Sequence, residues 1–68
     1  MRTFDLFRSK DVSGVSGTGK VAEGVIFHDG VTVVRWLSGH PSTNIYANVE
    51  DVLRIHGHEG ATRIEFIS

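Results

Sequence analysis

The chain has 68 residues, with 7 Lys and Arg against 8 Asp and Glu, a formal net charge of −1 and no Cys. The lack of Cys excludes disulfide bonds and Cys-based zinc sites, and the near-neutral charge disfavours a cationic nucleic-acid binder. Hydrophobic residues make up 40% of the chain, which suits a folded domain, yet no apolar run approaches the roughly 20 residues of a membrane helix. We therefore expect a single cytoplasmic domain over residues 1–68 with no membrane segment.

The N-terminal part of the chain predicts one strand followed by a long loop. Residues 3–8 alternate in part between apolar and polar side chains, so that Phe4 and Leu6 share one face of the strand. Residues 9–19 are rich in Gly and Ser, which is typical of a loop, and the segment is longer than a hairpin turn requires.

The next segment predicts a hairpin. Residues 20–27 form its first strand, in which Gly24 marks a candidate bulge or bend. The pair Asp29-Gly30 favours a tight turn because it tolerates positive φ angles. Residues 31–37 form the second strand, which is the strongest in the chain because it is rich in β-branched side chains, and both of its faces are largely apolar.

Two further strands are expected, one on each side of a helix. Residues 38–42 contain the only Pro and predict a loop, and residues 43–47 predict a short strand after it. Residues 61–67 alternate again and predict the final strand.

A two-turn helix over residues 49–56 is the best-specified local element. Asn48 is a good N-cap, and the helix dipole favours the anionic side chains of Glu50 and Asp51 in the first turn. Gly57 fits the position directly after the last turn. One face of this helix carries Val49, Val52, Leu53 and His56.

These elements predict a mainly β fold of the α+β class. Strands of this length joined by hairpins curl into a small barrel or a bent sheet. We therefore expect a small antiparallel SH3-like barrel, or a bent sheet of four to five strands, with one short helix at about 49–56 before the last strand. The likeness to an SH3-type barrel concerns topology alone.

A glycine-rich segment matches the first seven positions of a phosphate-binding P-loop, from Gly14 to Lys20. The Ser or Thr that would bind magnesium is replaced by Val21, and a strand follows where the motif requires a helix. Nucleotide hydrolysis is therefore not expected, although free backbone amides in such a loop can bind an anion. The candidate anion-binding residues are Ser13, Gly14, Ser16, Gly17, Thr18, Gly19 and Lys20.

The histidines raise the alternative of a metal-binding protein. His56 and His58 lie close to Glu59 in the sequence, and His40 could approach from a loop. Zinc needs three or four such ligands at about 2 Å, which the spacing does not guarantee. His56 and His58 are thus weak candidate ligands, and we expect no metal and no cofactor.

Contact residues are the main candidates for function. Trp, Tyr and Arg dominate binding hot spots because they bury a large area and still offer hydrogen bonds. The candidate partner-binding residues are Arg35, Trp36, Tyr46, His40, Ser42 and Thr43. Arg35 and Trp36 point to opposite faces of their strand, and whether Trp36 belongs to the core or to the surface stays open.

A nucleic-acid or nucleotide-binding module is a second alternative. Small barrels hold single strands on aromatic side chains beside a basic groove. The residues that would do this are Trp36, Tyr46, Arg2, Arg8, Lys10 and Lys20. The net charge of −1 does not favour nucleic acid as the partner.

Several motifs along the chain resemble a family of small proteins from actinobacteria and their phages. They are Asp11-Val12-Ser13-Gly14-Val15-Ser16-Gly17-Thr18-Gly19, Val21-Ala22-Glu23-Gly24-Val25, Arg35-Trp36, Pro41-Ser42-Thr43, Tyr46, Glu50-Asp51-Val52 and Ile55-His56-Gly57-His58. The resemblance implies a stand-alone small protein of phage or host with an accessory or host-directed role. It transfers no site residues.

No constellation of catalytic residues is present. The sequence has no strained nucleophile elbow and no activated Cys, and helix capping explains the adjacent carboxylates Glu50 and Asp51. We therefore expect no enzyme. The sequence favours a small interaction protein. It would bind a protein partner, such as a factor of the host that a phage infects, or form a homo-oligomer.

Overall fold

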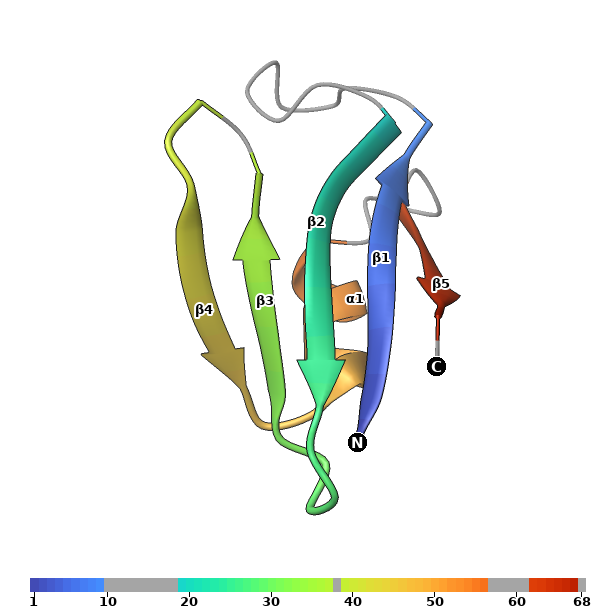
Figure 1. The fold of residues 1–68 in the computed structure, drawn as a ribbon, viewed down its shortest axis with the longest axis vertical. Helices are drawn as coiled ribbons and strands as arrows, with labels where there is room; N and C mark the ends of the chain where they lie inside the picture. The colour runs from blue at the N-terminus through green and yellow to red at the C-terminus, as the bar shows by residue number, and fades with distance from the viewer. Residues whose placement is uncertain (10–18, 38, 57–61, 68) are drawn as a thin grey trace.

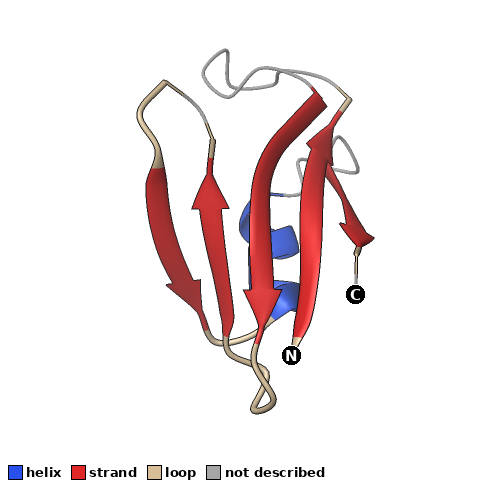
Figure 2. Cartoon of the chain, in the orientation of Figure 1, coloured by secondary structure: helices blue, strands red, loops and turns tan. Residues whose placement is uncertain are grey.

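The computed structural model describes residues 1–9, 19–37, 39–56 and 62–67, and it contains one antiparallel sheet and one helix (Figure 1). The elements are β1 (Arg2–Arg8), β2 (Gly19–Ile26), β3 (Thr32–Trp36), β4 (Ser42–Tyr46), α1 (Val49–His56) and β5 (Thr62–Phe66). The strands lie in the order β4-β3-β2-β1-β5, so the first strand lies inside the sheet between β2 and β5, and the last strand forms an edge. Helix α1 covers one face of the sheet and leaves the other face open (Figure 2).

The expected mainly β fold with a short helix before the last strand is confirmed. Each strand begins and ends within one residue of its predicted bounds, and α1 has the predicted bounds. Of the two expected forms, the structure has the sheet rather than a closed barrel, since β4 and β5 form its two edges. Helix α1 contacts residues of both edge strands.

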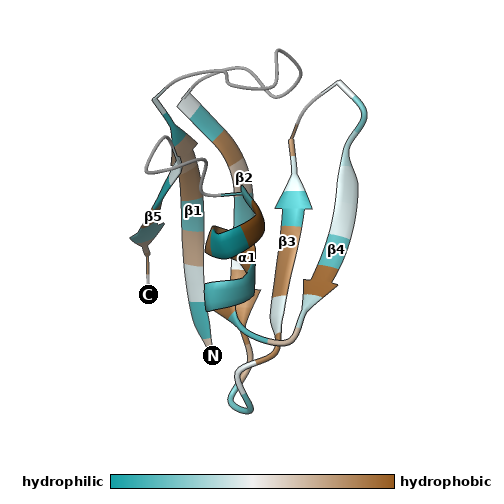
Figure 3. Ribbon diagram, turned by 180° about the vertical axis from the view of Figure 1, so that it is seen from behind, coloured by the Kyte–Doolittle hydropathy of each residue, from teal (hydrophilic) through white to brown (hydrophobic). Residues whose placement is uncertain are grey.

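The hydrophobic core lies between the sheet and α1. Phe4 and Leu6 of β1 are fully buried on this face, as their alternation predicts. Val52 is the fully buried residue of the helix. Figure 3 shows α1 lying against the sheet from this side. The other buried apolar residues are Val21, Ala22, Val34 and Trp36. The helix thus converts one side of the sheet into the core.

Gly24 has a packing role instead of the expected bulge. The register between β1 and β2 is continuous at the pair Phe4 and Gly24, and it shifts only between Leu6 and Phe7. A Cβ atom at position 24 would lie 2.3 Å from Cζ of Phe4, because the aromatic ring covers the glycine. The bulge expectation at Gly24 was wrong for this reason: the missing side chain makes room for the ring.

The predicted turn at Asp29-Gly30 joins β2 to β3. Gly30 has a φ of 95°, and its N–H donates to the carbonyl of Phe27 at 2.9 Å. The Asp29 carboxylate accepts a hydrogen bond from the N–H of Val31 at 3.0 Å. The left-handed conformation explains why the sequence needs Gly here.

The N-cap of α1 is also confirmed. The Oδ1 atom of Asn48 accepts a hydrogen bond from the N–H of Asp51 at 2.9 Å, which satisfies one of the unpaired amides of the first turn. The expected terminal glycine, Gly57, lies outside the described residues. No helix in the described part of the chain has the length and apolar character to cross a membrane.

Candidate protein-binding face

A largely apolar row crosses the strands β1 to β4 on the open face of the sheet. Thr3 pairs with Val25, Val25 with Val33, and Val33 with Ile45. The row continues past β5, because the N–H of Ile67 donates to the carbonyl of Thr3 at 2.8 Å. Its two ends are the most accessible, with Ile45 74% and Ile67 64% exposed. We call this set the open-face row: Ile67, Thr3, Val25, Val33 and Ile45.

A row of charges lies beside the open-face row on the same face. Asp5 is paired with Glu65 of β5 on one side and with Glu23 of β2 on the other. Arg35 of β3 pairs with Glu23 and ends the charged series. Like charges opposite one another destabilise a sheet unless a countercharge is near. The acidic part of this row therefore needs cations.

Lys20 and Arg63 supply these countercharges. Nζ of Lys20 lies 3.2 Å from Oδ1 of Asp5 and 3.4 Å from Oε2 of Glu23. The contact with Asp5 is the largest cause that raises the pKa of Lys20 above its ordinary value of 10.5, with a smaller contribution from Glu23 and an opposing one from desolvation. Nη2 of Arg63 lies 2.7 Å from Oε2 of Glu65.

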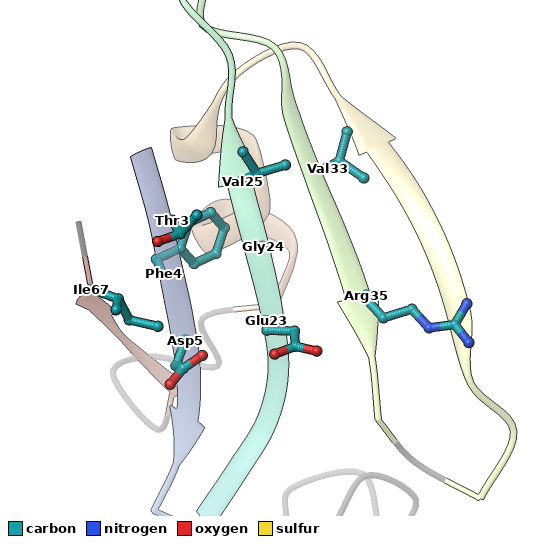
Figure 4. A pocket seen from close by; sticks show the side chains of 9 residues that line it. All are labelled: Thr3, Phe4, Asp5, Glu23, Gly24, Val25, Val33, Arg35 and Ile67. Atoms are coloured by element: carbon teal, nitrogen blue, oxygen red, sulfur yellow. The ribbon is translucent and has the colours of Figure 1, made fainter. Parts of the chain in front are cut away.

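The two rows border a groove of about 310 Å³ in the open face (Figure 4). Val25 and Val33 stand side by side along it, while Asp5 and Glu23 lie at the next level of the sheet. Phe4 lies behind the strands, where its ring backs Gly24. An apolar groove with carboxylates at one end suits an apolar side chain that is followed by a basic group.

The structure divides the predicted partner-binding residues between several surfaces. Arg35 and Thr43 lie on the open face, where Nη1 of Arg35 donates to Oγ1 of Thr43 at 2.9 Å. Ser42 pairs with Trp36 and thus belongs to the helix-covered side of β4. His40 is exposed in the segment before β4.

Trp36 belongs to the core, which answers the question that the sequence left open. Its side chain is 9% exposed, and its ring centroid lies 4.7 Å from that of His56. Tyr46 is half-buried beside them, and its hydroxyl shares a hydrogen bond of 3.0 Å with Nε2 of His56. Trp36 is therefore not available as a contact residue, because it packs between the sheet and α1.

The candidate metal ligand His56 makes other contacts in the described part of the chain. His56 belongs to the aromatic cluster with Trp36 and Tyr46. His58 lies outside the described residues. No group of three or more His, Asp or Glu side chains that could hold a metal occurs among the residues that the structure describes.

Two of the predicted nucleic-acid contacts have other roles. Arg8 is 3% exposed, and its Nε donates to Oγ1 of Thr62 at 3.0 Å, so it joins β1 to β5 inside the protein. Trp36 is buried as well. The expected surface role of Arg8 was wrong, because the alternation of β1 turns this side chain to the helix-covered face with Phe4 and Leu6. Lys10 lies outside the described residues.

Most of the predicted anion-binding loop lies outside the described residues, namely Ser13, Gly14, Ser16, Gly17 and Thr18. Gly19 has a φ of 80° and begins β2. Lys20 is the second residue of that strand and is paired with carboxylates. The strand at this position agrees with the expectation that the segment is not a P-loop.

The open-face row could not be predicted from the sequence. The alternation of side chains along each strand indicates that Val25 and Val33 lie on the same face of the hairpin. It does not signal that Ile45 and Ile67 extend the row to both edges, since that depends on the register of four strand pairs.

Comparison with known proteins gives one match over the full length. The model of a family described as Acb5 phage protein matches residues 1–68. Undecaprenyl-diphosphatases from two strains of Cereibacter sphaeroides, ATCC 17029 and ATCC 17023, are each 46% identical over 46 residues, which is 65% of this chain. The chain spans only 17% of the length of these phosphatases. No solved structure matches the chain.

Proposed function

The chain belongs to the Acb5 phage protein family, and we propose that it is a non-enzymatic accessory protein that acts in the cytoplasm by contact with a protein partner. The phage association expected from the sequence is confirmed by the family, whereas the actinobacterial origin stays a prediction. A factor of the bacterial host and a second copy of the chain are the two partner classes that we propose.

The open face of the sheet is the observation that carries this proposal. A sheet that is covered on one side usually presents polar side chains to water on the other side. Here the uncovered side carries Val25 and Val33 at its centre and exposed Ile45 and Ile67 at its ends. A contiguous exposed apolar surface with a charged border is typical of a protein-binding site.

The groove defines the chemistry of the partner. Val25 and Val33 would pack on an apolar side chain, and the carboxylates of Asp5 and Glu23 would attract a basic group beside it. Arg35 at the end of the charged row would select an acidic group on the opposite side of the partner segment. Such a mixed pattern supplies specificity, because a wrong partner would leave charges unpaired.

The activity of the phosphatases is not part of the proposal. The match covers 17% of their length, so the activity of the whole phosphatases is not carried over to this chain.

The test compares two substitutions of one chemical kind on opposite sides of the molecule. Val33→Asp introduces a charge in the open-face row, and Ile55→Asp introduces the same charge on α1, where Ile55 is 58% exposed. The tagged chain and both variants are used to capture proteins from a lysate of the bacterial host, and mass spectrometry identifies what is retained.

We expect the wild-type chain and Ile55→Asp to retain the same host protein and Val33→Asp to lose it. Circular dichroism checks that each variant is folded, and Ile67→Asp, at an exposed end of the row, replaces Val33→Asp if the latter unfolds. Equal capture by wild type and a folded row variant would place the contact elsewhere and reject the open face as the binding site.

A further inference from the structure

The hydrogen-bond pattern of β3 determines which backbone groups of β4 are left at the edge of the sheet. Next to the β2–β3 turn, the N–H of Phe27 donates to the carbonyl of Val31 at 2.9 Å. At the far end of β3, the N–H of Leu37 donates to the carbonyl of Val21 at 3.0 Å. In an antiparallel strand the hydrogen-bonding direction alternates from residue to residue. Odd-numbered residues of β3 therefore bond to β2, and even-numbered residues, such as Val34, bond to β4.

The same alternation applies to β4. Asn44 pairs with Val34, so its backbone groups point toward β3, as do those of Ser42 and Tyr46. The N–H and C=O groups of Thr43 and Ile45 consequently point away from the sheet. Within the part of the chain that the structure describes, no strand lies beyond β4 to receive them.

The two edges of the sheet differ in how they are protected. Natural edge strands are blunted by charged side chains, Pro or bulges, which prevent pairing with another chain. β5 carries the ion pair of Arg63 and Glu65. β4, from Ser42 to Tyr46, carries no charge and no Pro, its register with β3 has no shift, and every residue but Tyr46 is exposed. β4 is thus the edge that is open to another strand.

We propose that β4 pairs with β4 of a second copy around a two-fold axis through Asn44, which joins the two sheets into one. This register places Thr43 opposite Ile45 of the second copy, and both are residues whose backbone groups point outward. The two residues of such a pair exchange two N–H···O=C bonds, and the two-fold axis generates a second, identical pair. An axis that passed between two residues of β4 would instead bring outward groups against groups already bonded to β3.

Two further observations favour a second copy over a foreign peptide as the occupant. The strand carries no charged side chain, so two copies of it can lie side by side without repulsion between like charges. The net charge of −1 adds little repulsion between copies. The pairing also keeps both open faces on one side, so that Ile45 lies beside Thr43 of the second copy and the open-face row extends across both molecules. The inference rests on the proposal that the chain acts by contact, and it names one contact surface.

The test combines mass with amide exchange. Sedimentation equilibrium of the wild-type chain from about 10 µM to about 1 mM, a range that covers weak association, should show the mass rise from 7.5 kDa toward twice that value. Over the same range, hydrogen exchange should slow several-fold at the amides of Thr43 and Ile45. The amides of Ser42, Asn44 and Tyr46 are already bonded to β3 and should not change.

Two variants of one position separate backbone pairing from contact between side chains. Ile45→Pro removes an outward N–H without removing a bond to β3, so it should stay at 7.5 kDa throughout. Ile45→Thr removes the apolar side chain but keeps both backbone groups, so it should still dimerise.

Three results would overturn the inference: a constant wild-type mass, a dimer that survives Ile45→Pro, or a dimer lost equally in Ile45→Thr and Ile45→Pro. If Ile45→Pro does not fold, the exchange pattern of the wild type decides alone. A monomeric wild-type chain that still captures a host protein in a Val33-dependent manner would reject the edge pairing and leave the proposed function standing.

Discussion

The two faces of the sheet are made by the same strands but differ in what covers them. On the helix-covered face, Phe4 and Val34 are fully buried. On the open face, their sequence neighbours Thr3 and Val33 are half-buried, and α1 lies on the other side of the sheet (Figure 2). The alternation of each strand thus assigns one half of its side chains to stability and the other half to contact. Under the proposed function, a chain of 68 residues uses one layer of strands for two tasks, with the core on one face and the partner contact on the other.

Phe4→Ala should show the largest effect on the covered face. Phe4 is fully buried against Gly24, and loss of a buried Phe side chain costs about 3–5 kcal/mol. A small domain has little more stability than this, so we expect the variant to be largely unfolded in urea titrations. Phe66→Ala is the matched control, because Phe66 pairs with Phe4 but is 44% exposed. Equal losses of free energy for both variants would contradict the placement of the core.

Two adjacent residues give the most direct comparison of the faces. Val34→Thr buries a hydroxyl in the core and should lower the free energy of unfolding by about 1–3 kcal/mol. Val33→Thr makes the same change on the open face and should alter it by less than about 0.5 kcal/mol. Thermal unfolding of both proteins measures the difference. If Val33→Thr proved the more destabilising variant, the assignment of the two faces would be reversed.

The N-cap of α1 should contribute less than the core beneath it. Asn48→Ala removes the acceptor for the N–H of Asp51, which costs about 1 kcal/mol in typical helices. Asn48→Asp keeps an acceptor at the same position and should retain most of the stability. Urea titration distinguishes the two, and an equal loss in both would show that the side chain does not act as a cap.

The smallest effect should come from Lys20 on the open face, and it depends on pH. The folded-state pKa of Lys20 is raised above 10.5, chiefly by Asp5, so its contribution to stability is fully present below that pH. The contribution is lost as pH rises through the folded-state pKa. The wild-type protein should therefore lose more stability than Lys20→Met when thermal melts are compared between about pH 9 and pH 12. Identical pH profiles would show that the ion pair contributes nothing.

The helix and the β2–β3 turn were predictable because the residues that specify them lie close together in the sequence. The helix bounds follow from an apolar period and from Asn48, and the turn follows from Asp29-Gly30. The face of β1 that carries Phe4 and Leu6 follows from alternation alone.

The candidate site was not predictable to the same extent. The open-face row exists because β5 pairs with β1 and places Ile67 beside Thr3, a contact that no local pattern specifies. The same long-range pairing buries Arg8 against Thr62. The charge of Arg8 alone would assign this side chain to the surface. Trp36 presented the opposite problem, since its residue type fits both a core and a hot spot, and its burial depends on α1.

The position of β1 between β2 and β5 also has a consequence for how the protein is made. The pair Phe4 and Phe66 closes a loop of nearly the whole chain, and such distant contacts slow folding because their entropic cost must be met first. When only β1 and β2 have left the ribosome, β1 is therefore still an edge strand, although it lies inside the finished sheet. Until the last residues of the chain emerge from the exit tunnel, β1 must not pair with a strand of another chain that is still being made.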